Sequence, residues 1–240
     1  MLHLPHPLRP LHPPEYRRSL FGIAIVATVR LLAIGAVVVL AAASPPRAHA
    51  AQEAAFGAAV RQFSAASSGD KSSIEPAAEA FASLLKAEPT NPVLMAYAGA
   101  SQAMLASTTV LPWKQMGFVE DGLAEVDKSL AMLTPAADAP IQRGTPGSLE
   151  VKFVAANTFL GVPSFMNRAA RGEKLLNEVL ASPLFAQAPL GFQGAVWMRA
   201  AAFAAKQERK ADAARYLDEV ISHNAPQAEA ARALRQGAGA

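Results

Sequence analysis

The sequence contains no cysteine, and after position 50 it has a single histidine, His223. The first absence excludes disulfide bonds, thiolate metal ligands, a cysteine nucleophile and a lipid-modified cysteine. The second leaves almost nothing for a histidine-based metal or acid–base site, and no cluster of carboxylates has metal-ligand spacing. We therefore expect no metal, no cofactor and no catalytic residue. His223 is interpreted as a helix-terminal residue that complements the helix dipole.

The excess of positive charge is confined to the start of the chain. The whole sequence has 22 basic and 19 acidic residues, but five of the basic residues and only one acid precede position 51. From Ala51 onward, 17 basic residues face 18 acidic ones. The calculated isoelectric point of about 9.3 therefore gives no support to nucleic-acid binding.

The first 50 residues have the layout of a secretory signal peptide. An unbroken apolar run, LLAIGAVVVLAAA, covers residues 31–43 and ends before SPPRAHA, which places small side chains at Ala48 and Ala50. This pattern fits a signal peptidase, so we predict cleavage between Ala50 and Ala51. Residues 51–240 would then be a periplasmic or secreted domain that contacts a membrane only through an uncleaved leader.

Two alternatives remain open for the leader. Residues 20–43 are apolar over about the length that crosses a bilayer, interrupted by Arg30, and they would serve as an inner-membrane anchor if they were retained. Residues 1–19 are an unusual prefix for a signal peptide, because they are rich in proline and histidine. An over-extended N-terminus, with translation beginning at Val29, would explain this prefix.

After Ala51 the sequence lacks strand-like alternation, and alanine, leucine and charged residues recur at intervals of three and four. This spacing predicts helices separated by clusters of Pro, Gly, Ser and Asn. Asn91 before Pro92 is a helix start, and we expect Ser73 to cap one helix and Pro226 to open the last. The predicted helices are 52–66, 74–87, 92–106, 115–133, 148–160, 168–181, 190–206, 210–223 and 226–236.

Large and small residues recur at similar offsets in successive helix pairs. Residues 196–226 show the pattern best, with Trp197, Ala200 and Ala201 in one helix and Ala213 in the next. Small residues let paired helices approach closely. Ala77, Gly99, Gly122 and Gly172 occupy comparable positions upstream.

These residues make 74–226 resemble the tetratricopeptide-repeat (TPR) superfamily. The stretches LPWKQMGFVEDGL, residues 111–123, and VPSFMNR, residues 162–168, are also similar to an uncharacterised bacterial group of exported repeat proteins. The resemblance implies an all-α fold in which antiparallel helix pairs stack as a TPR-like right-handed α-solenoid, followed by a C-terminal capping helix. Irregular loops at 107–114, 135–147 and 161–167 depart from the strict repeat.

Aromatic residues beside the irregular loops are the candidate binding residues, because loops on a rigid scaffold often contact ligands. The candidates for ligand or partner binding are Trp113, Lys114, Phe118, Phe165 and Arg168, and Phe192 shares their position beside a loop. The alternative is that the rings fill gaps between helices. The acids from Glu120 to Asp127 are interpreted as a solvated helix face.

Export and the repeat pattern together predict a non-enzymatic scaffold that binds a protein or peptide in the periplasm or cell envelope. The alternative is a periplasmic small-molecule-binding repeat protein that assists solute uptake. An apolar pocket lined by the turns around Trp113 and Phe165 would favour this alternative.

Overall fold

The computed structural model describes residues 46–237. Most of the predicted signal peptide, and all of the alternative anchor at 20–43, lie outside these residues. Within the described range no helix combines the length and apolarity needed to cross a membrane. Ala50 and Ala51 both lie in the first described helix, so the predicted cleavage would shorten that helix at its N-terminal end.

The described residues are mostly helical, which confirms the all-α class. Each predicted helix is present, with shifts of several residues at some ends. The helices are α2 (Pro46–Ser67), α3 (Ile74–Ala87), α4 (Pro92–Met104), α5 (Pro112–Ala131), α6 (Gly147–Gly161), α7 (Ala169–Ala181), α8 (Leu190–Lys206), α9 (Lys210–Ser222) and α10 (Ala228–Gly237).

The predicted helix starts have mixed outcomes. Asn91 caps α4 as expected, because its side-chain oxygen accepts hydrogen bonds from the amides two and three residues further on, at 3.0 and 3.3 Å. Ser73 was expected to cap α3, and this is wrong: its hydroxyl donates to Asp70 instead, at 2.6 Å. Pro226 does not open the last helix, because α10 begins at Ala228.

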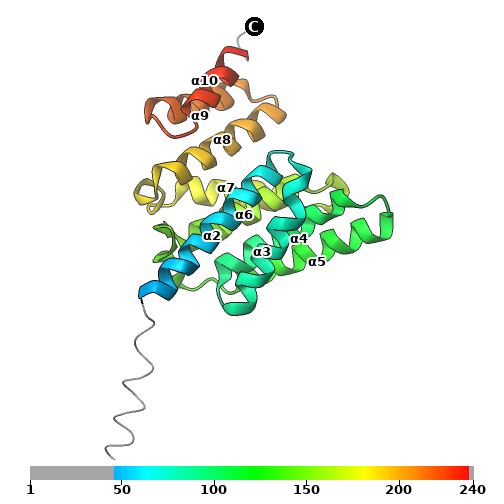
Figure 1. Cartoon of the computed structure of the whole chain (residues 1–240). Coiled ribbons are helices and arrows are strands. Elements are labelled where there is room, and N and C mark those ends of the chain that lie inside the picture. Colours follow the sequence, from blue (N-terminus) through cyan, green and yellow to red (C-terminus); the bar gives the residue numbers. More distant parts are fainter. Residues whose placement is uncertain (1–45, 238–240) are drawn as a thin grey trace, which may run out of the picture. The chain divides into compact units, whose positions relative to one another are not determined.

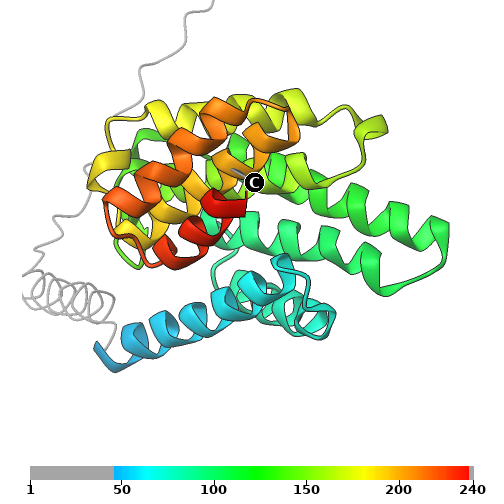
Figure 2. The same ribbon diagram turned by 90° about the horizontal axis from the view of Figure 1, so that it is seen from above.

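Consecutive helices pack on each other in the pairs α4 with α5, α6 with α7, and α8 with α9. Figure 1 shows α6 and α7 between the helices α2–α5 and the helices α8–α10. Helix α6 also contacts α4 and α5, and α10 packs on α9. Viewed from above in Figure 2, α8–α10 overlap α6 and α7.

Two hydrophobic cores meet at α6. One core is built mainly from α2, α3 and α4, and it includes Val151 and Val154 of α6. The other extends from α5 to α10 and includes Ala155 and Phe159 of the same helix. Buried residues therefore occur on several sides of α6, as expected for a helix enclosed by neighbours.

Four aromatic rings hold α2 against α3 and α4. Phe81 and Tyr97 stack in parallel with ring centroids 4.7 Å apart. Phe56 and Phe63 of α2 meet both rings edge-on, at 5.0 to 6.1 Å. Such clusters stabilise a fold beyond the area that they bury.

The loop between α5 and α6 contains a small hairpin that the sequence did not predict. Strands β1 (Pro140–Gln142) and β2 (Thr145–Pro146) pair antiparallel after a short 3₁₀ turn, η3 (Pro135–Asp138). Arg143 and Gly144, which connect the strands, both have positive φ angles, 47° and 71°. Two successive residues of this kind form the tight turn that best joins twisted strands.

Candidate functional site

A large cleft, here called the inner cleft, lies between the helices and has a volume of about 1410 Å³. Its walls come from α2, α4, α5, α6 and α8. The short 3₁₀ turns η2 (Leu105–Thr108) and η4 (Ser164–Met166) also contribute. The volume exceeds the roughly 300–1,000 Å³ of typical small-molecule sites. The inner cleft is therefore large enough for an elongated ligand.

Helical periodicity explains which side chains line the inner cleft. From α6 the lining residues are 153, 154, 157, 158 and 161, and from α8 they are 191, 192, 195, 198 and 199. Both sets follow the spacing of one helix face. The large apolar members of the lining are Phe63, Met104, Met116, Phe153, Phe165, Met166, Phe192 and Met198.

Methionine is concentrated at the inner cleft. Of the six methionines in residues 46–237, four line it. Unbranched thioether side chains adapt to ligands of different shape, which is why they recur at permissive binding surfaces. Phe153 and Phe192 meet edge-on across α6 and α8, with centroids 5.4 Å apart. The apolar wall thus combines ordered rings with adaptable side chains.

The charges that line the inner cleft are all positive. Arg143 and Arg199 are its charged residues, and among residues 46–237 the lining includes no aspartate, glutamate or lysine. The described part of the chain has nearly equal numbers of acids and bases, so the acid-free lining is a local property of this cleft.

Arg143, which is 43 % exposed, belongs to a polar cluster around the buried carboxyl group of Glu150. Glu150 of α6 is 1 % exposed. Its Oε1 accepts a hydrogen bond from the Tyr97 hydroxyl at 2.9 Å and one from Arg143 at 3.5 Å, and its Oε2 has no hydrogen-bond partner among the described residues. Burial raises the pKa of Glu150 to about 7, against the lowering effects of Arg143 and Tyr97. The Arg143 guanidinium also lies 5.3 Å from the centroid of the Phe56 ring.

Arg199 has a different environment. Its guanidinium donates only to the backbone carbonyl of Asn157, at 3.4 Å, and its buried Nε has no hydrogen-bond partner in the described structure. No acid within residues 46–237 forms an ion pair with it. Burial lowers the pKa of Arg199. An arginine in a protein nevertheless stays protonated, so Arg199 presents a positive charge to an apolar cleft.

Among the predicted binding residues, Phe165 lines the inner cleft and is 66 % exposed at its edge. Trp113 and Lys114 are exposed in the first turn of α5, because that helix begins at Pro112 and not at the predicted residue 115. Neither residue lines the cleft. Phe118 is half-buried in α5 and does not line it either.

Arg168 takes part in a separate cluster on the other side of α6. It pairs with Asp127 at 3.1 Å, and Arg171 pairs with the same carboxylate. Both guanidinium groups lie over the Phe159 ring, at 5.4 and 4.9 Å from its centroid. Asp127 is 31 % exposed, so it stays in contact with solvent while its two ion pairs join α5 to α7.

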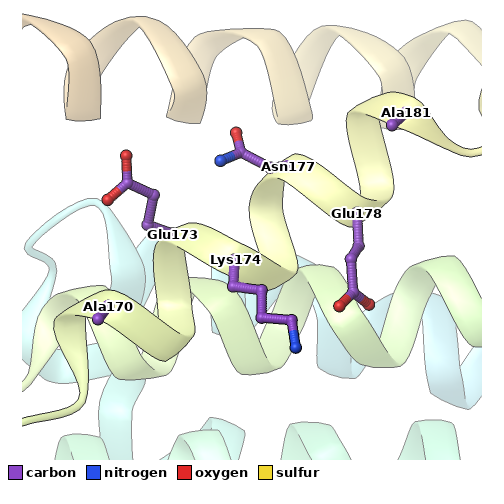
Figure 3. A pocket seen from close by; sticks show the side chains of 6 residues that line it. All are labelled: Ala170, Glu173, Lys174, Asn177, Glu178 and Ala181. Atoms are coloured by element: carbon purple, nitrogen blue, oxygen red, sulfur yellow. The ribbon is translucent and has the colours of Figure 1, made fainter.

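A second, shallow depression of about 520 Å³ lies on the outer face of α7. Figure 3 shows the six side chains that line it, and all come from this one helix. Two of them, Glu173 and Glu178, already form ion pairs with Arg209 and Lys152. Within residues 46–237 its lining comes from this one helix, so a ligand there would stay largely open to solvent.

The sequence reading did not identify Arg199, Asn157 or the Glu150 cluster. One local pattern pointed to Arg199: it lies seven residues after Phe192 and directly after Met198, on an apolar helix face. The Tyr97–Glu150 contact joins residues 53 positions apart, and nothing in the local sequence predicts it. Comparison with known proteins found no matching family model, curated protein or solved structure.

Proposed function

We propose that this chain is an exported, non-enzymatic helical-repeat protein that holds an elongated, mainly apolar small molecule in the inner cleft. In this proposal the paired helices form a TPR-like right-handed solenoid, capped by α10. The observation that carries the proposal is the cleft of about 1410 Å³ with an apolar, methionine-rich lining drawn from five helices. Of the two functions expected from the sequence, this geometry supports small-molecule binding better.

The apolar lining supplies the binding energy in this account. Each methylene group that leaves water for such a surface contributes about 0.8 kcal/mol. A mainly apolar surface discriminates weakly between apolar ligands of similar length, and the polar side chains of the lining fix their orientation. A ligand that is transferred unchanged needs no catalytic residue, so the proposal requires none.

A neutral, apolar fluorescent probe such as N-phenyl-1-naphthylamine tests this proposal. We expect saturable binding to the protein. Ala195→Trp, which places a large ring in the inner cleft from α8, should weaken probe binding by roughly tenfold or more. Ala170→Trp adds the same ring to the outer face of α7 and should leave binding unchanged. Equal binding by both variants would contradict the proposal, provided that their thermal unfolding is also equal.

A protein partner is the second candidate, because large apolar side chains are exposed near the edge of the inner cleft. Val110, Trp113 and Phe165 are 89 %, 69 % and 66 % exposed. Aromatic side chains of this kind are enriched at protein interfaces. A photo-crosslinking residue at Trp113 should capture one defined protein in cells if this surface is an interface, whereas the same residue at Ala170 should not.

A further inference from the structure

The inner cleft contains Arg199, whose positive charge no acid of residues 46–237 neutralises. Six other arginines, at positions 143, 168, 171, 209, 215 and 235, each pair with a carboxylate. Arg61 and Arg232 are exposed to solvent. Arg199 is half-buried, and no acid of residues 46–237 reaches it. Arg199 therefore combines partial burial with a positive charge that no described acid pairs.

A half-buried charge without a partner is unfavourable, so the binding of an anion lowers the free energy of the site. The guanidinium offers planar donors that match a carboxylate, and one of these, Nε, is buried without an acceptor. The lining contains no aspartate or glutamate that would repel an incoming anion. The other lining arginine, Arg143, is already bonded to Glu150.

The residues that flank Arg199 on its own face of α8 are apolar, whereas Asn157 and Thr158 line the inner cleft from α6. Phe192, Ala195 and Met198 share its face of α8, and Phe153 packs against Phe192 from α6. A ligand whose anionic end meets Arg199 would therefore place its remaining length against apolar side chains. A small, fully hydrated anion would leave most of the cleft unused.

We propose that the ligand of the inner cleft is an amphipathic organic anion, a single carboxylate attached to an apolar tail, and that Arg199 binds the carboxylate. This inference rests on the proposed function. It specifies the chemical nature of the ligand's head group, a carboxylate, and the residue that binds this group, Arg199. The contact is charge-assisted and does not involve a covalent step.

A competition binding assay tests this proposal. The protein is expressed from the full-length gene and purified in the form that remains after any cleavage in the cell. N-phenyl-1-naphthylamine reports occupancy, and dodecanoate and dodecanol compete with it at neutral to alkaline pH. These competitors share a tail and differ in the charge of the head. If the leader is retained, the protein is held in lipid nanodiscs, with empty nanodiscs as the blank.

We expect dodecanoate to displace the probe at a concentration roughly tenfold or more below that of dodecanol. Arg199→Met keeps an apolar stem of similar length and should abolish this preference, measured within the variant as the ratio of the displacing concentrations of dodecanoate and dodecanol. Arg199→Lys keeps a positive charge without the planar guanidinium group and should retain part of the preference. This variant replaces Arg199→Met in the assay if the Met variant does not fold. Arg232→Met, on the exposed face of α10, should behave as the wild type does.

The outcomes separate the two proposals. Probe binding without a preference for the acid, or a preference that survives in Arg199→Met, would overturn the role of Arg199 and leave the proposed function standing. Failure of the probe to bind the wild-type protein at all would overturn both.

Discussion

Gly99 of α4 and Gly122 of α5 touch through their backbones. A methyl group added to Gly122 would lie 2.5 Å from the carbonyl oxygen of Gly99 and 2.6 Å from the amide nitrogen of Ala103. Backbone atoms on both sides leave no flexible side chain that can move away. This contact sets how closely α4 approaches α5, and both helices contribute walls to the inner cleft.

Gly122→Ala should therefore destabilise the fold. We expect the free energy of unfolding to fall by about 1–3 kcal/mol, because an overpacked contact forces the helices apart. Gly117→Ala is the matched control in the same helix. A methyl group there meets no atom within 4 Å, and alanine improves helix stability by roughly 0.5–1 kcal/mol. Denaturant unfolding of both variants measures the difference, and equal stability would contradict the close contact.

The pH dependence of stability should report the buried carboxyl of Glu150. Its pKa is raised from 4.5 to about 7 in the folded protein, mainly by burial. Between these values the folded state holds a proton that the unfolded state has released. The free energy of unfolding should therefore fall as pH rises from about 5 to about 7, by roughly 3 kcal/mol in total.

Glu150→Gln should remove this pH dependence. The glutamine stays neutral over the whole range and still accepts the hydrogen bond from Tyr97, while Arg143, which is 43 % exposed, remains solvated. The control is Glu120→Gln, since Glu120 is exposed on α5. Chemical unfolding at a series of pH values measures the slopes. A slope that is the same in Glu150→Gln and in wild type would show that this carboxyl does not titrate in the range.

Affinity should rise with the length of the ligand's tail. Each added methylene contributes about 0.8 kcal/mol, which corresponds to roughly fourfold in Kd, until the tail fills the inner cleft. Competition by carboxylic acids of increasing length measures this slope. In Arg199→Met the slope should persist while every affinity is lower, because head and tail bind different residues. A length-independent Kd would place the tail outside the apolar lining.

The predicted signal peptide can be tested separately, through the N-terminus of the mature protein. We expect the mature protein to begin at Ala51, which a mass measurement of the purified chain detects. A bulky residue at Ala50, as in Ala50→Tyr, should prevent cleavage by the signal peptidase and leave the protein attached to the membrane. A wild-type chain that retains residues 20–43 would instead support the anchor.

The helices were predictable from local sequence, whereas the cleft was not. Asn91 and Pro92 marked a helix start through their own backbone chemistry, and the small residues Gly99 and Gly122 marked a close helix contact. Ser73 was misjudged because Asp70, three residues earlier, competes for its hydroxyl. Local preferences of this kind act within one or two turns of the chain.

The lining of the inner cleft depends on how distant helices face each other. Phe153 and Phe192, or Arg199 and Asn157, meet only after α6 and α8 have packed. Trp113 is aromatic and lies near a predicted loop, but the start of α5 at Pro112 places it on an exposed helix turn. Phe165 shares these sequence features and does line the cleft. The type of residue alone did not distinguish the two.

A crystal structure with a carboxylic acid that carries bromine at the far end of its tail tests the central claim most directly. Anomalous scattering locates the bromine, and the electron density locates the head. The account predicts the carboxylate at hydrogen-bond distance from Arg199 and the bromine inside the inner cleft, among its phenylalanine and methionine side chains. A ligand seated on the outer face of α7, or bound in the cleft with its carboxylate away from Arg199, would contradict the account.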